Sequence, residues 1–233
     1  MGLILACADA HLQRYDVDMN ESASKRSVLR IVLVVLLVLA LIVLAIVATV
    51  LLPILTHRSP GGSGQEIPTD FGAESSATCA DGRTRILKAN STDGSPADLA
   101  EVSAGDKLVV SGQGFDSGIG IYVSFCAIPE NAETKPGPCL GGIPEGAEDG
   151  DLAESQELSS AWVTNNWAWR AFASHTYENA AEGTFEVRLT VPEPVTDALD
   201  CTVQKCAIVT RADHTAGSDR VQDMVLPIAF VRE

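Results

Sequence analysis

The sequence predicts an all-β antiparallel sandwich of about seven strands, preceded by a single N-terminal transmembrane helix. Near the N-terminus of this 233-residue chain lies a long uncharged apolar run. After it come short apolar runs separated by Gly, Pro and other turn residues. No segment beyond the long run has a convincing helical period of 3.6 residues, so its apolar runs are assigned to strands.

The apolar run, residues 31–55, has no charge and only Thr49 as a polar side chain over 25 residues. A helix of that length covers roughly 37 Å, against about 30 Å of bilayer hydrocarbon. It has no polar stripe, which a helix packed on a soluble core would show. A cleaved signal peptide has an apolar region of only about 7–15 residues, which ends in a small-x-small cleavage site. In the candidate site that ends at Ala48, the first small position is occupied by the large residue Ile46. We predict a retained signal anchor.

The charges beside this helix predict its orientation. Lys25, Arg26 and Arg30 stand just before it, and only Arg58 follows closely. By the positive-inside rule the N-terminus is cytoplasmic and the C-terminal bulk is extracytoplasmic. We therefore expect a single-pass protein of the cell membrane.

The segment after the helix, residues 59–78, is rich in Gly, Ser and Pro and has no period, which predicts a flexible tether. Whether the functional start is Met1 or Met19 stays open. The expected organisation is a cytoplasmic segment 1–30, the anchor 31–55, a linker 56–78 and the sandwich domain 79–233.

The predicted strands lie between turn signals in the last two thirds of the chain. Alternation is clearest where Phe185, Val187, Leu189 and Val191 share one face. We predict strands at residues 85–88, 107–111, 119–127, 160–164, 184–191, 206–211 and 224–231.

The charge of the extracytoplasmic part excludes some partners. Residues 1–58 hold five of the 16 basic and four of the 31 acidic side chains, so residues 59–233 hold 11 and 27, a net of −16. Such a domain repels nucleic-acid phosphates, which argues against nucleic-acid binding. Anionic lipid would repel it too, so we expect it to stand off the membrane.

Six cysteines are present, and Cys7 would be cytoplasmic and reduced. Cys201 and Cys206 enclose four residues at the entry to a strand, a spacing that could bring them within disulfide range. Cys126 and Cys139 flank a Pro/Gly-rich loop. Two local bridges would leave Cys79 over, either free or bridged to another chain. A zinc site is a poor alternative because no C-x-x-C pair occurs.

These residues carry a family resemblance. VSFCA (123–127), the later Cys139, GTFEVRLTV (183–191) and DCTVQKCAI (200–208) resemble the neocarzinostatin-like family of actinobacteria. The continuation VTRADHTAGSDRVQDMVLPIAF (209–230) is similar to a relative of that fold in actinobacterial cell-surface proteins. The resemblance covers about residues 80–232 and implies an immunoglobulin-like sandwich with disulfides Cys126–Cys139 and Cys201–Cys206.

The family's antibiotic apoproteins are freely secreted and hold an apolar chromophore in a cleft. This chain departs from them in keeping an anchor and in inserting extra residues where its aromatics gather. We therefore use the resemblance to predict the fold of this chain and not the identity of a ligand.

No hydrolase elbow, metalloprotease helix, P-loop or dinucleotide fingerprint occurs, so we do not expect an enzyme. A triad of Ser218, His214 and Asp219 has no support from the pattern. The acidic run 145–157 is typical of a solvated loop, with a weak calcium site at Asp149 and Asp151 as the minor alternative.

All three tryptophans lie within residues 161–177. We predict that Trp162, in a strand, packs into the core. The aromatics of the insertion could instead fold onto their own sandwich. We predict that a partner or ligand is bound by Trp167, Trp169, Arg170, Phe172, His175 and Tyr177.

Two functions fit these residues. The first is an interaction module that serves as an accessory subunit of an integral envelope membrane complex, such as a respiratory or transport complex. The second is a cell-surface protein that binds haem or another small apolar molecule near His175 and Tyr177, since haem iron needs such a side chain in an apolar pocket.

Overall fold

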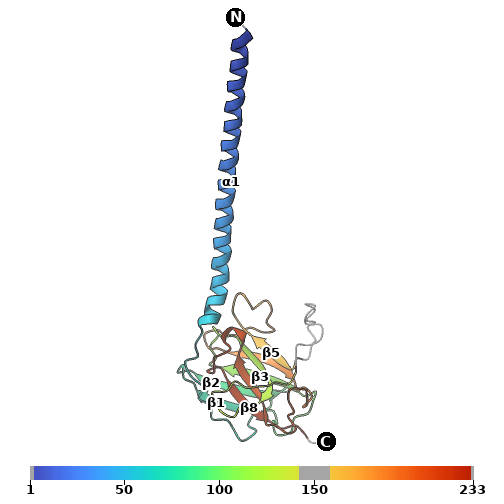
Figure 1. Ribbon diagram of the computed structural model, residues 1–233. Helices are drawn as coiled ribbons and strands as arrows, with labels where there is room; N and C mark the ends of the chain where they lie inside the picture. The colour runs from blue at the N-terminus through green and yellow to red at the C-terminus, as the bar shows by residue number, and fades with distance from the viewer. Residues whose placement is uncertain (1–2, 142–157, 232–233) are drawn as a thin grey trace. The chain divides into compact units, whose positions relative to one another are not determined.

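The computed structural model describes residues 3–141 and 158–231, and the chain divides into two compact units, Met1–Pro53 and Ile54–Glu233. The elements of both units are drawn in Figure 1. The first unit is helical and the second holds all the strands.

Helix α1 runs over Leu3–Thr56, which is longer than the predicted span. Its part Val28–Thr56, 29 residues, is long and apolar enough to cross a membrane, and none of it is buried in protein. It contains the predicted segment 31–55. One N-terminal apolar helix of this kind fits a membrane anchor or a signal sequence.

The second unit consists of two antiparallel four-stranded sheets, and the all-β prediction is confirmed. The seven predicted strands are all present, with ends that differ by at most three residues, and an eighth, β1, precedes them. One sheet has the order β1 (Glu74–Thr78), β2 (Thr84–Ser91), β3 (Lys107–Gln113), β6 (Phe185–Thr190). The other has the order β5 (Ser160–Val163), β4 (Ile121–Ala127), β7 (Cys206–Ala212), β8 (Met224–Ile228).

The core lies between the two sheets. From one sheet it takes alternate residues of β6, and Phe185, Val187 and Leu189 are buried there together with Val191, as the alternation predicted. From the other it takes residues such as Val123 and Ile208. The strands of the first sheet alternate between buried and more exposed residues, so their register is set by one apolar face. In the second sheet β7 and β8 are buried on both faces, and Cys126, Ala207, Val209 and Val225 form a smaller cluster on the face away from the main core.

The residues predicted as a flexible tether, 59–78, are bonded to the sandwich. The side-chain amide of Gln65 donates to the carbonyl of Val225 (2.8 Å) and accepts from its N–H (2.7 Å). Glu74–Thr78 forms β1 and pairs with β2. The sequence predicted a tether because this segment is rich in Gly, Ser and Pro and has no period. The segment is ordered because β8 has an unpaired edge, which an amide side chain can satisfy with one donor and one acceptor.

Both disulfides implied by the family resemblance are present, Cys126–Cys139 and Cys201–Cys206. Cys79 is buried and forms no disulfide within the described part of the chain. Its Sγ lies 3.7 Å from the carbonyl oxygen of Ala77, and burial raises the pKa of the thiol.

Candidate functional site

Exposed apolar side chains gather at two places on the sandwich. Single exposed apolar residues are ordinary, but a gathering marks an interaction surface. Three of those on the described sandwich line one groove, and two more belong to the predicted aromatic insertion. The large apolar side chains that the described residues after the helix expose are Phe71, Trp167, Phe172, Val195, Val203 and Val231.

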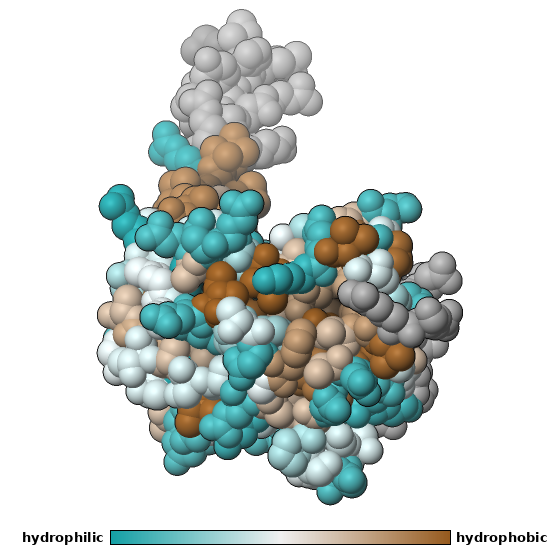
Figure 2. All heavy atoms as spheres, turned by 90° about the horizontal axis from the view of Figure 1, so that it is seen from below, coloured by the Kyte–Doolittle hydropathy of each residue, from teal (hydrophilic) through white to brown (hydrophobic). Residues whose placement is uncertain are grey.

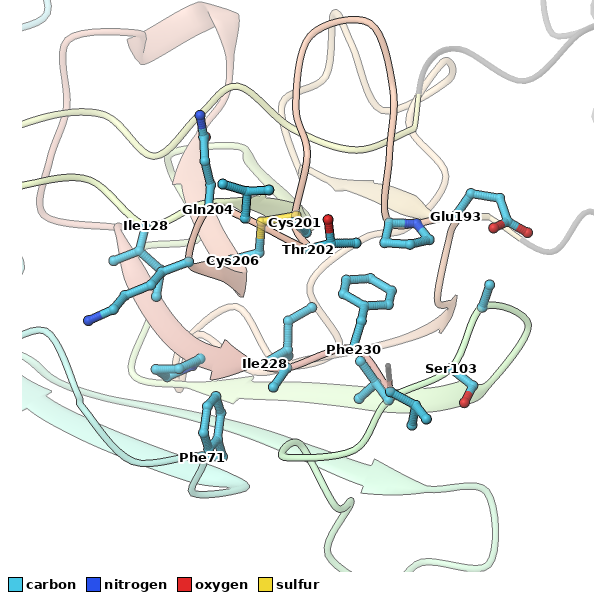
Figure 3. Close-up of a pocket in the computed structure, with 18 of the residues that line it drawn as sticks. Phe71, Ser103, Ile128, Glu193, Cys201, Thr202, Gln204, Cys206, Ile228 and Phe230 are labelled. Carbon is cyan, nitrogen blue, oxygen red and sulfur yellow. A yellow bond between two sulfur atoms is a disulfide. The ribbon is translucent and has the colours of Figure 1, made fainter. Parts of the chain in front are cut away.

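The groove has a volume of about 800 Å³, which is within the range of small-molecule sites. It lies at the end of the sandwich where β6 and β8 finish and β7 begins. Figure 3 shows Ile228 and Phe230 in its middle, between the Cys201–Cys206 disulfide on one side and Phe71 on the other.

One wall of the groove is the turn before β7. The carbonyl of Asp200 accepts the N–H groups of Val203 (3.3 Å) and Gln204 (2.9 Å), and the Cys201–Cys206 bridge closes the turn. Hydrogen bonds from Thr202 hold the pKa of the Asp200 carboxyl below its usual value. Val203 is held at the rim with 81% of its surface exposed.

The floor is the end of β8 and the residues after it. Ile228 is buried, and Phe230 packs against the main core. The N–H of Val231 donates to the carbonyl of Val102, and the N–H of Val102 donates to that of Ala229, each at 2.9 Å. Because these two hydrogen bonds fix residues 229–231 against Val102, the floor of the groove is preformed. In the view from below, apolar surface lies near the middle of the face and hydrophilic residues surround it (Figure 2).

The groove does not match a haem site. None of the described residues that line it is a histidine or tyrosine, and its two cysteines, Cys201 and Cys206, are joined in a disulfide. Haem iron needs an axial side chain that can coordinate it. Among the described residues that line it, only Glu193 and Lys205 are charged, so the groove suits an occupant that carries few charges.

The predicted core position of Trp162 is wrong. In β5 the neighbours Ala161 and Val163 are buried, while Trp162 is half-buried on the opposite face. Side chains alternate along a strand, so only one of the two sets can face the core. The indole N–H of Trp162 donates to Oδ2 of the buried Asp213 at 2.9 Å.

Trp162 belongs to an aromatic cluster of four residues: Tyr122, Trp162, Trp169 and His214. The ring of His214 meets that of Trp162 at 5.2 Å and that of Trp169 at 5.0 Å, both edge to face. Its Nδ1 lies 2.9 Å from the hydroxyl oxygen of Tyr122. Trp169, predicted as a binding residue, therefore packs on its own sandwich and holds the insertion in place.

Trp167, Arg170 and Phe172 remain on the surface of the insertion, with Trp167 64% and Phe172 70% exposed. Asn166 shapes this loop. Its carbonyl accepts the N–H of Arg170 at 2.8 Å, and its side-chain oxygen accepts that of Ala168 at 2.9 Å. These three exposed side chains stay candidates for contact with a partner.

The structure does not place His175 and Tyr177 at a common binding site. His175 is half-buried beside β5, exchanges backbone hydrogen bonds with that strand, and has its pKa lowered by burial. Tyr177 is only 5% exposed and its hydroxyl donates to the carbonyl of Ile119 at 2.9 Å. Burial raises the pKa of that hydroxyl. Tyr177 is a core residue, and neither side chain lines the groove.

The possible catalytic triad and metal sites considered from the sequence do not form in the described residues. His214 is bonded to Tyr122, whereas Asp219 contacts His57 and accepts backbone N–H groups, so these two do not form a triad with Ser218. Within residues 3–141 and 158–231 no three metal-binding side chains come together. Asp149 and Asp151 lie outside the described residues.

Sequence reasoning missed the residues of the groove. Phe71 lies in the segment predicted as linker, and nothing in that segment marks it. Val203 carried a signal that could have been used: it is an apolar residue inside a polar turn between two cysteines. An exposed valine in such a turn is more informative than one in a strand.

Comparison with known proteins adds little. No family model matches the sequence, and no curated protein matches it. Among solved structures the chain is similar to macromomycin, with 16% identity and a TM-score of 0.33, over 62% of this chain and 99% of that one. Membership of the neocarzinostatin-like family therefore stays a prediction.

Proposed function

We propose that the protein is a single-pass, membrane-anchored binding module whose sandwich domain stands outside the cell membrane and binds its partner in the end groove. The observation that carries this proposal is the groove itself. The described residues after the helix expose six large apolar side chains, and three of them, Phe71, Val203 and Val231, line the groove. Preformed concave surfaces with an apolar floor are typical binding sites.

The occupant we propose is an apolar segment of another envelope membrane protein, so that the chain serves as an accessory subunit of a membrane complex. The anchor confines the module to the membrane, where such partners are concentrated. The groove offers the hydroxyl of Ser103 beside its apolar floor, and this hydroxyl can pair with the backbone of an extended segment.

A small apolar molecule is the second candidate, favoured by the volume of about 800 Å³, which would suit one drug-sized ligand. It would lie against Ile228 and Phe230. Haem is not proposed, because the lining has no side chain to coordinate iron.

The test is purification of the tagged full-length chain from its native membranes in mild detergent. We expect a stoichiometric membrane protein to co-purify, and the variants Phe71→Asp and Val203→Asp to lose it. Val195→Asp is the matched control, because Val195 is 52% exposed and lies outside the groove lining. An extracted small molecule in place of a protein would favour the second candidate. If neither a protein nor a small molecule co-purified, or if Val195→Asp lost the partner as well, the groove proposal would be wrong.

A further inference from the structure

The chain that follows the apolar helix is fastened to the β7–β8 connection, residues 213–223. Nε2 of His57 lies 3.0 Å from Oδ2 of Asp219, and the N–H of Arg220 donates to Oγ of Ser59 at 3.0 Å. Gly62 then forms a parallel bridge with Arg220. His57 directly follows Thr56, where the apolar segment ends. A membrane that contains this segment therefore has its surface next to the β7–β8 connection.

The same connection supports the aromatic insertion, residues 165–175. Asp213 accepts the indole N–H of Trp162, and His214 packs on Trp169. His214 and Asp219 are five residues apart in the chain. Their Cα atoms are therefore separated by at most about 18 Å. The aromatic insertion and the residues that follow the apolar helix thus both contact the β7–β8 connection, at one end of the sandwich.

The chemistry of the insertion differs from that of the rest of the domain. Residues 158–177 contain no Asp or Glu, although residues 59–233 carry a net charge of −16. Trp167 and Phe172 are exposed, and Arg170 is an exposed cation between them. Trp is enriched at the membrane–water interface, and an Arg guanidinium forms strong hydrogen bonds to phosphate groups.

We propose that Trp167 and Phe172 insert into the lipid headgroup layer beside the anchor, with Arg170 on the lipid phosphates. The inference rests on the proposed anchoring of the chain and is independent of what the groove binds. The overall acidity predicted a domain that stands off the membrane. The absence of Asp and Glu from residues 158–177 and the fastened juxtamembrane chain reverse that expectation for the insertion.

Tryptophan fluorescence of the full-length chain in nanodiscs tests the proposal. All three tryptophans lie at residues 162–169, and the apolar helix has none, so the emission reports this end of the domain alone. The lipids carry a nitroxide near the headgroup. We expect them to quench the emission, and we expect Trp167→Ser to lose the quenched part. Val203→Ser, at the groove, is the matched control and should quench like the parent chain.

Quenching by acrylamide in the water phase without quenching by the nitroxide lipids would overturn the proposal and leave the insertion free for a protein partner. Equal lipid quenching in Trp167→Ser would also overturn it. A chain that fails to enter nanodiscs would refute the anchoring as well. Loss of groove binding would leave the lipid quenching unchanged, so the two proposals fail separately.

Discussion

Nε2 of His57 lies 3.0 Å from Oδ2 of Asp219, a fully buried carboxylate, and this contact joins the first residue after the apolar helix to the β7–β8 connection. Asp219 also accepts the N–H groups of Val221 and Gln222, so it is ordered from both sides. The domain thus begins at His57, well before the first strand.

Replacing His57 by alanine should loosen this start without unfolding the sandwich. The buried Oδ2 of Asp219 loses this partner, which costs about 1–3 kcal/mol. Arg58, exposed and next in the chain, then becomes a faster tryptic site. Timed trypsin digestion with mass spectrometry measures the rate. His175→Ala, at the other side of the insertion, should leave cleavage after Arg58 unchanged. Equal rates in His57→Ala and the parent chain would show that the contact does not order this segment.

Gln65 caps the free edge of β8 through Val225, and Gln65→Ala removes both hydrogen bonds. The buried N–H of Val225 loses its partner, while its carbonyl keeps the 3.3 Å hydrogen bond from the Ser75 hydroxyl. We expect a loss of about 1–3 kcal/mol in the free energy of unfolding. Urea denaturation followed by circular dichroism measures it. Gln113→Ala is the control, because the Gln113 side chain is exposed at the end of β3. A loss no greater than that of the control would contradict the capping role.

Trp162→Phe keeps a ring in the aromatic cluster but leaves the buried Oδ2 of Asp213 without its indole donor. An unsatisfied buried acceptor costs about 1–3 kcal/mol. Trp167→Phe, on the exposed part of the insertion, should stay within about 0.5 kcal/mol of the parent. Thermal unfolding of both variants compares them. If Trp167→Phe were the more destabilised, the assignment of the two tryptophans would be reversed.

The thiol of Cys79 should resist alkylation in the folded protein. It is buried, and burial raises its pKa, so the reactive thiolate is scarcer at pH 8 than for an ordinary cysteine of pKa about 8.5. The rate of labelling by iodoacetamide should rise with pH and should jump on unfolding in guanidinium. Peptide mapping distinguishes Cys79 from Cys7. Rapid labelling of native protein at pH 8 would mean that this thiol is accessible.

Strands could be predicted where burial of one face requires apolar residues at alternate positions, as at Phe185, Val187 and Leu189. β1 could not, because Glu74–Thr78 buries only the side chain of Ala77 and is ordered by its partner β2. The packing of residues 59–66 was hidden for a similar reason. It depends on Gln65 meeting an edge 160 residues away, which no local pattern records.

The candidate site was less predictable than the fold. Clustering of the tryptophans in the sequence drew attention to the insertion, but it could not show that Trp162 and Trp169 turn toward His214. That partner comes from a distant connection. Tyr177 likewise looked available and is bonded within the core. The groove is lined by residues from six segments of the chain, so its apolar floor is visible only after folding.

Site-specific photo-cross-linking in intact cells tests most directly whether the groove is the binding site. Phe71, 42% exposed at the groove, is replaced in the full-length chain by the photoreactive analogue p-benzoylphenylalanine, and the exposed Asn179 at the opposite end serves as the control position. We predict a light-dependent adduct with one membrane protein, or with one small molecule, at position 71 and none at position 179. No adduct at position 71, or the same adduct at both positions, would contradict a binding function for this groove.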